Sequence, residues 1–124
     1  MGPVASSVLI VDDDARFRAW ARVLLERAGY VVVGEAGDGV SAFAAARRAR
    51  PELVLLDLQL PDMDGFEVAR VLSGERSPPA IVLTSTRERG DFGNRIDNSG
   101  ALGFVPKEQV SGEALADLLA RRGG

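Results

Sequence analysis

The sequence predicts an α/β fold: a doubly wound parallel sheet of five strands in the order 2-1-3-4-5, with helices on both faces. Short apolar runs of strand length alternate with stretches whose apolar residues recur at helical spacing. The connections between them are short, which favours a parallel sheet joined by crossover helices. At 124 residues, of which 46% are hydrophobic, the chain has the size of one domain with a single sheet.

The first half of the chain predicts three strands and two helices. The run at residues 8–11 is wholly apolar and ends in three aspartates, as expected for a strand buried on both faces. A helix begins at Ala15 and ends at the stop signal Gly29, because apolar residues recur three and four positions apart. An alanine-rich helix then ends before Pro51. The strands predicted in this half cover residues 8–11, 30–33 and 53–56.

The second half repeats the alternation, with one weak segment. A turn at residues 61–65 leads into a third helix, which closes at residues 77–79, Ser-Pro-Pro. Residues 87–99 are polar and contain two glycines, so we expect helix four to be short or mobile. Ser111 is expected to cap a last helix with one apolar face. The strands predicted in this half cover residues 80–83 and 103–105.

Composition restricts the possible chemistry and location. The chain has no cysteine and no histidine, so any metal must be held by oxygen ligands. The formal charge of −3 argues against direct nucleic-acid binding through the phosphate backbone. Without a signal-like or membrane-spanning stretch, we expect a cytoplasmic protein with no membrane contact. We also expect one domain over residues 1–124, either stand-alone or a fragment of a longer protein, with a flexible leader at 1–6, a flexible tail at 121–124, and no room for a DNA-binding domain.

Polar residues follow four of the predicted strands. Asp12 and Asp13 follow the first, Asp57 the third, Thr84 the fourth, and Lys107, the only lysine in the chain, follows the fifth. In a doubly wound sheet the carboxyl ends of the strands meet at one edge, and ligands bind where the strand order reverses. The sequence therefore predicts that these five side chains converge on one site.

The predicted site suits a divalent cation and phosphoryl transfer. Three crowded carboxylates repel one another unless a cation binds or one takes up a proton. Mg²⁺ prefers such oxygen ligands, and the backbone carbonyl of Gln59 is a further candidate. A carboxylate can attack phosphorus if cations stabilise the equatorial oxygens, a role expected of Mg²⁺ and Lys107. The hydroxyl of Thr84 can donate to a phosphate oxygen and so sense the modification.

The sequence resembles the receiver domain of bacterial two-component response regulators over nearly its whole length. The resemblance rests on residues 8–14 (VLIVDDD), 55–65 (LLDLQLPDMDG), 84–85 (TS) and 103–107 (GFVPK). It implies a flavodoxin-like sheet order and Mg²⁺ as the cofactor. It also implies a histidine kinase or phosphotransfer protein as the phosphoryl donor, and a phosphorylation-dependent homodimer as one possible output.

The resemblance also implies a role for each matching residue. Asp57 would be the phosphoacceptor, and Asp12 and Asp13 would hold Mg²⁺ together with Asp57. Thr84 would be the switch hydroxyl and Lys107 the phosphate-pairing lysine. Phe104 would be the aromatic switch position, where the phenylalanine lacks the hydroxyl of the more frequent tyrosine; packing into the core explains Phe104 equally well.

Two other functions share this pattern. One is an interaction module that keeps the fold but signals without phosphate, suggested by the glycine-containing helix four. The other is a Mg²⁺-dependent phosphohydrolase that forms an aspartyl phosphate; that chemistry requires a general acid two residues after the nucleophile, where this chain has Gln59. Asp62 and Asp64 are expected to form turns rather than to bind metal, and Asp14 to cap the first helix.

Overall fold

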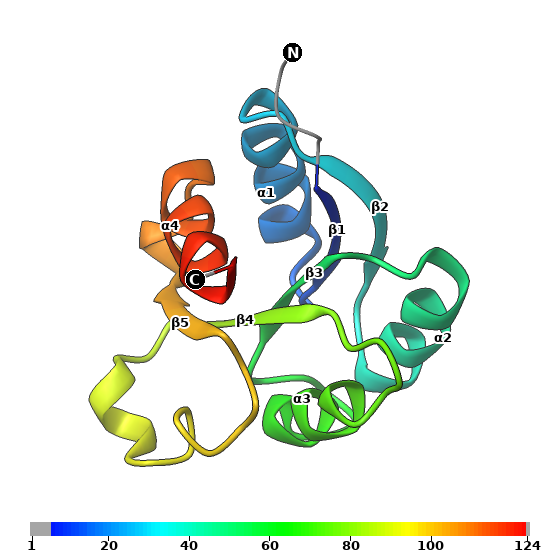
Figure 1. Cartoon of the computed structure of the whole chain (residues 1–124). Helices are drawn as coiled ribbons and strands as arrows, with labels where there is room; N and C mark the ends of the chain where they lie inside the picture. The colour runs from blue at the N-terminus through cyan, green and yellow to red at the C-terminus, as the bar shows by residue number, and fades with distance from the viewer. Residues whose placement is uncertain (1–5, 124) are drawn as a thin grey trace.

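The computed structural model describes residues 6–123 and confirms the predicted α/β architecture (Figure 1). All five strands run parallel in the order β2-β1-β3-β4-β5, so the order reverses between β1 and β3. The strands are β1 (Ser7–Val11), β2 (Val31–Ala36), β3 (Leu53–Asp57), β4 (Ala80–Ser85) and β5 (Gly103–Pro106). The α-helices are α1 (Ala15–Arg27), α2 (Gly39–Ala49), α3 (Gly65–Ser73) and α4 (Gly112–Gly123).

The sheet is covered by helices on both faces. Helices α1 and α4 lie on one face and α2 and α3 on the other (Figure 1). Alternate residues of each central strand enter different cores: Val8 and Ile10 pack with the α1 and α4 layer, whereas Leu9 and Val11 pack with the α2 and α3 layer. Because the central strands are buried on both faces, they read in the sequence as continuous apolar runs.

Short polar side chains begin the helices at the carboxyl edge of the sheet. Asp14 accepts from the amide of Arg16 at 2.9 Å and caps α1, as expected. Asp64 caps α3 in the same way, accepting from the amide of Phe66 at 2.8 Å. At the opposite edge, the Ser111 hydroxyl accepts from an amide of α4 at 3.0 Å. These caps satisfy helix amides that have no partner within the helix.

Two predicted elements differ most from the structure. Strand β2 extends to Ala36, three residues beyond the predicted end, and carries a register shift opposite Val8/Leu9. The segment predicted as helix four contains one 3₁₀ turn, η1 (Arg89–Phe92), followed by hydrogen-bonded turns. It is held to the protein by Ile96, which is buried, and by the ring of Phe92. The expectation of a short element is confirmed, with a 3₁₀ turn in place of an α-helix.

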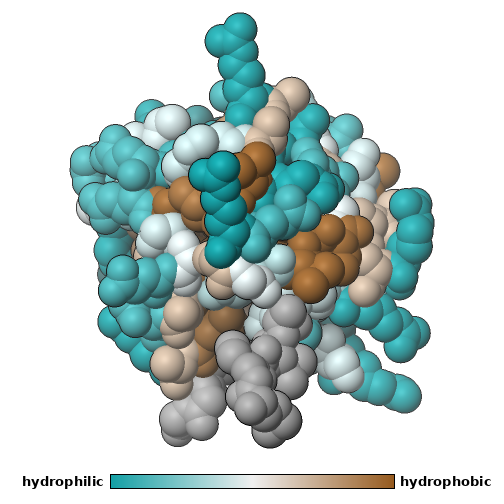
Figure 2. Space-filling model, turned by 90° about the horizontal axis from the view of Figure 1, so that it is seen from above, coloured by the Kyte–Doolittle hydropathy of each residue, from teal (hydrophilic) through white to brown (hydrophobic). Residues whose placement is uncertain are grey.

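Residues 1–5 of the expected leader lie outside the described residues, and α4 continues to Gly123 through most of the expected tail. Within residues 6–123, no helix has the length and apolar character required to cross a bilayer. The face seen in Figure 2 is mainly hydrophilic, with separate hydrophobic areas between charged side chains.

Candidate functional site

Three aspartates meet where β1 and β3 end. Val11 pairs with Leu56 in the parallel register, so the next residues, Asp12 and Asp57, lie side by side. Asp57 was predicted to follow its strand but is the last residue of β3. Asp12 is fully buried, Asp57 is 3% exposed, and Asp13 is exposed to solvent. Each offers a carboxylate oxygen, and these oxygens all lie within 4.8 Å of one another. The predicted trio is therefore brought together, with one member open to solvent.

Lys107 joins this trio from the far side of β4. It lies directly after β5, at the start of the 3₁₀ turn η2 (Lys107–Gln109). Its ammonium nitrogen Nζ lies 2.7 Å from Asp12 Oδ2 and 3.3 Å from Asp57 Oδ2. Burial acts to lower the pKa of Lys107, but the hydrogen bond to Asp12 and the charge of Asp57 outweigh it, and the pKa is raised. Lys107 is thus a fixed cation between two buried carboxylates.

The surroundings of Asp57 alter the pKa of its carboxyl group. Burial is the largest cause and raises its pKa from 3.8 to about 6, and the charge of Asp12 acts in the same direction. The amide of Gln59, which donates to Asp57 Oδ1 at 3.1 Å, and the ammonium of Lys107 oppose this rise. The negative charge of Asp57 is only partly balanced by its neighbours, so this carboxylate is suited to bind an additional cation or to form a covalent bond.

Thr84 lies beside Asp57 on the neighbouring strand. The two residues are paired in register between β3 and β4, and Thr84 is fully buried. Its Oγ1 atom has no hydrogen-bond partner within residues 6–123. A buried hydroxyl without a hydrogen bond destabilises the folded state, so an acceptor introduced next to Asp57 would form a favourable hydrogen bond with Thr84.

Phe104 packs against the core on the α2 and α3 face of the sheet. Its ring packs at 5.8 Å from Phe92, which in turn lies 5.8 Å from Phe66 at the start of α3. Arg95 lies over the Phe66 ring at 4.2 Å and pairs with Asp64 at 2.7 Å. Phe104 is therefore the inner end of a row of three rings that connects β5, η1 and α3.

The loop after β3 holds Asp57 through backbone contacts. The backbone of Gln59 bridges to Asp64, which closes this loop in front of α3. Gly65 packs so tightly beneath it that an added Cβ would lie 2.5 Å from the carbonyl oxygen of Asp57 and 2.6 Å from the Cα of Leu58. Only glycine fits here, because both of the neighbouring atoms belong to the backbone.

Two residues that support the site were not identified from the sequence. Asp62, predicted only as a turn former, accepts from the amides of Gly39 and Val40 at 2.7 and 3.0 Å, and so joins the loop after β3 to the start of α2. Those hydrogen bonds lower its pKa. Arg18 donates to the Asp12 carbonyl at 2.6 Å and pairs with Glu35 of β2. The contacts of Asp62 with Gly39 and of Arg18 with Glu35 join residues 23 and 17 positions apart, and they leave no local sequence signal.

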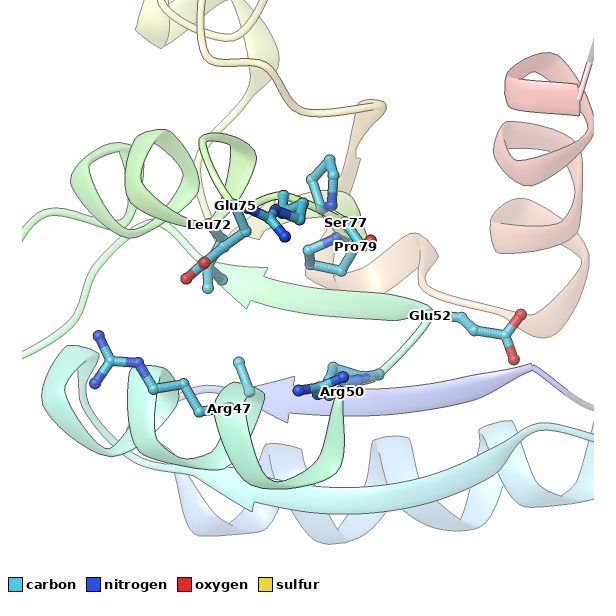
Figure 3. A pocket seen from close by; sticks show the side chains of 11 residues that line it. Arg47, Arg50, Glu52, Leu72, Glu75, Ser77 and Pro79 are labelled. Atoms are coloured by element: carbon cyan, nitrogen blue, oxygen red, sulfur yellow. The ribbon is translucent and has the colours of Figure 1, made fainter.

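A cavity lies away from the carboxylate site. It has a volume of about 700 Å³ and lies between the C-terminal ends of α2 and α3, at the edge of the sheet where β3 and β4 begin (Figure 3). Its lining includes arginines and glutamates, among them Arg50, Glu52 and Glu75. Since Asp57 stands at the opposite end of β3, this cavity is separate from the carboxylate site.

Comparisons with known proteins agree with this geometry. A family model described as the response regulator receiver domain matches residues 8–119. The transcriptional regulatory protein PdtaR of Mycobacterium tuberculosis is 36% identical over 84% of this chain and 50% of its own length. The virulence regulator BvgA of Bordetella pertussis is 38% identical over 84% of this chain and 50% of its own length. The chain thus spans about half the length of these curated relatives.

Solved structures give the same result for the fold. The signal receiver domain of the putative response regulator NarL from Mycobacterium tuberculosis is 30% identical and superposes with a TM-score of 0.84, covering 98% of this chain and 99% of that one. The chemotaxis response regulator CheY4 of Vibrio cholerae is 28% identical, with a TM-score of 0.80 over 95% of this chain and 98% of that one.

Proposed function

Because this chain belongs to the response regulator receiver family, we propose that it is a phosphorylation-dependent switch of a two-component system that accepts a phosphoryl group on Asp57. The observation that carries the proposal is the convergence of Asp12, Asp13 and Asp57 with Lys107 at the carboxyl edge of the sheet. This is the charge arrangement that phosphoryl transfer requires: a carboxylate nucleophile next to groups that stabilise negative charge on phosphate oxygens.

The three aspartates fit a Mg²⁺ ion. They provide oxygen ligands only, and one of them is solvent-exposed, which suits an ion that keeps several of its waters. The proposed ligands are the carboxylates of Asp12, Asp13 and Asp57 and the backbone carbonyl of Gln59. When bound, the ion would neutralise the crowded carboxylates and the charge on an incoming phosphoryl group.

The protein's own residues would perform the transfer. An oxygen of Asp57 attacks the phosphorus of a phosphohistidine, and the bond from phosphorus to nitrogen breaks as the acyl phosphate forms. Lys107, already 3.3 Å from Asp57 Oδ2, would pair with the new phosphoryl oxygens. The proposed donor is a histidine kinase or a phosphotransfer protein, and the site assists this single modification and its slow reversal rather than repeated turnover of a substrate.

The response would pass through Thr84. Its buried hydroxyl, which has no partner among the described residues, would donate to a phosphoryl oxygen on Asp57, one strand away, and pull the end of β4 inward. Phe104 is paired with Leu83, the residue before Thr84, and its ring contacts η1 through Phe92. Movement at Thr84 would thereby reach the segment between β4 and β5, where a partner or a second copy of the chain would bind.

Labelling with a small phosphodonor tests the proposal. We expect the purified chain to gain one phosphoryl group when incubated with acetyl phosphate and Mg²⁺, as read by intact mass. The Asp57→Asn variant should gain none, whereas Asp117→Asn, which changes an exposed aspartate of α4, should label like the parent chain. Absence of labelling, or labelling that persists in Asp57→Asn, would overturn the proposal and favour an interaction module that works without phosphate.

A further inference from the structure

The ammonium group of Lys107 has a third neighbour besides the two carboxylates. Its Nζ atom lies 4.8 Å from the centroid of the Phe17 ring, within the range of a cation–π interaction. The Lys107 side chain is only 16% exposed, so little water competes for this contact. Three groups therefore surround the ammonium: Asp12, Asp57 and the face of an aromatic ring.

The position of Phe17 is coupled to the acidic loop. It lies in the first turn of α1, where its backbone amide donates to Asp14 Oδ1 at 3.4 Å. On its other side the ring lies 5.7 Å from Trp20, and it packs against the core beneath α1 and α4. The ring is thus held by its own helix and core, and it is attached to the loop that carries Asp12 and Asp13.

A lysine needs such support at this place. Its four-carbon stem is flexible and its ammonium has no preferred direction, unlike the planar guanidinium of arginine. The carboxylates alone do not fix the ammonium, because both would be shared with a cation or a phosphoryl group when the site is in use. An aromatic face attracts a cation without neutralising its charge, because the ring itself is uncharged. The ammonium therefore remains available to pair with a phosphoryl oxygen.

We propose that Phe17 is a positioning residue that holds the Lys107 ammonium beside Asp57, so that it meets the oxygens of an incoming phosphoryl group. The inference rests on the proposed phosphorylation of Asp57 and adds to it a residue on α1 that acts through Lys107. The competing explanation is that Phe17 only fills the core under α1. In that case, replacing Phe17 would change the rate of Asp57 labelling by the same factor whether or not Lys107 is present.

A double-mutant cycle separates these explanations. The rate of labelling by acetyl phosphate at saturating Mg²⁺ is measured for the parent chain, Phe17→Leu, Lys107→Ala and the double variant. We expect Phe17→Leu to slow labelling about 3- to 10-fold, and by less than about 2-fold when Lys107 is already alanine. Phe17→Tyr, which keeps the ring, should label at nearly the parent rate. An unchanged rate in Phe17→Leu, or an equal loss in both backgrounds, overturns the inference.

A measurement without phosphate keeps the inference separate from the proposed function. Lys107 is the only lysine of the chain, so selective labelling of lysine gives one NMR signal for its ε-methylene group. A ring face over the ammonium should move that signal upfield, and the shift should disappear in Phe17→Leu and persist in Phe17→Tyr. If the signal is the same in Phe17→Leu, the contact is absent and the inference fails. If the signal behaves as expected while the parent chain takes up no phosphoryl group, the proposed function fails instead. Should Phe17→Leu not fold, as judged by circular dichroism, Phe17→Met replaces it in both experiments.

Discussion

Replacing Asp57 with asparagine should stabilise the folded chain at neutral pH. The substitution keeps the size of the side chain and removes one of two carboxylate charges buried at the end of the sheet. Burial and the charge of Asp12 destabilise the ionised form of Asp57 in the folded state, and they raise its pKa. Lys107 lies 2.7 Å from Asp12 in the parent chain, and we expect this contact to remain in the variant, so that the ammonium keeps a counter-charge.

The size of the effect follows from the pKa of Asp57. A rise from 3.8 to about 6 corresponds to at most about 3 kcal/mol, at roughly 1.4 kcal/mol per pKa unit. Residual contact with solvent reduces this, so we expect the variant to be more stable by about 1–2 kcal/mol at pH 7. Because the pKa of Asp57 is higher in the folded state, the parent chain loses stability as the pH rises from about 4 to 6. The difference between the two chains should therefore be small at pH 4 and reach its full size above pH 6.

Urea unfolding without divalent cations, followed by circular dichroism from pH 4 to pH 7, measures this difference. The control is Asp117→Asn, which removes an exposed charge of α4 and should change the stability by less than about 0.5 kcal/mol. Added Mg²⁺ should stabilise the parent chain more than Asp57→Asn and so narrow the gap between them. A variant no more stable than the parent at pH 7, or a difference that does not depend on pH, would refute this reasoning.

Two further substitutions test how the backbone supports the site and the fold. Gly65→Ala should lower the free energy of unfolding by at least about 2 kcal/mol and slow labelling of Asp57, because the new Cβ would lie 2.5 Å from the Asp57 carbonyl oxygen. The matched control is Gly90→Ala, whose Cβ would have open space around it among the described residues. Equal stability of the two variants would contradict the close packing at Gly65. Arg50→Gly should raise the stability by about 0.5–1 kcal/mol in thermal unfolding, because Arg50 has a φ of 46° in the left-handed region at the end of α2. A lower melting temperature of Arg50→Gly would show that its side chain stabilises the protein by more than this strain costs.

The central strands and the charged residues after them were predictable from the sequence. Strands such as β1 and β3 are buried on both faces, so each is an unbroken apolar run whose end is marked by an aspartate. The parallel sheet then brings Asp12, Asp57 and Lys107 together by topology alone, although some forty residues or more separate each from the next. This is why the site could be inferred without any local motif that joins all of its members.

Features that depend on tertiary contacts were not predictable. The end of β2 contains Gly34 and Glu35, which interrupt its apolar pattern; Glu35 is held in the strand by Arg18 and Arg22 from α1. The segment that replaces helix four takes its shape from Phe92 and Ile96, whose packing partners lie on other elements. Long-range contacts of this kind leave no periodicity along the chain.

Calorimetric titration with Mg²⁺ tests whether Asp12, Asp13 and Asp57 form one divalent-cation site, in which the proposed nucleophile is itself a ligand. We expect the chain to bind one Mg²⁺, and Asp13→Asn to weaken binding at least about tenfold, because it removes one carboxylate charge from the ligand set. Asp14→Asn, which changes the adjacent helix cap, should bind Mg²⁺ with nearly the parent affinity. No heat of binding, or equal affinities for Asp13→Asn and Asp14→Asn, would show that these three carboxylates do not form a Mg²⁺ site.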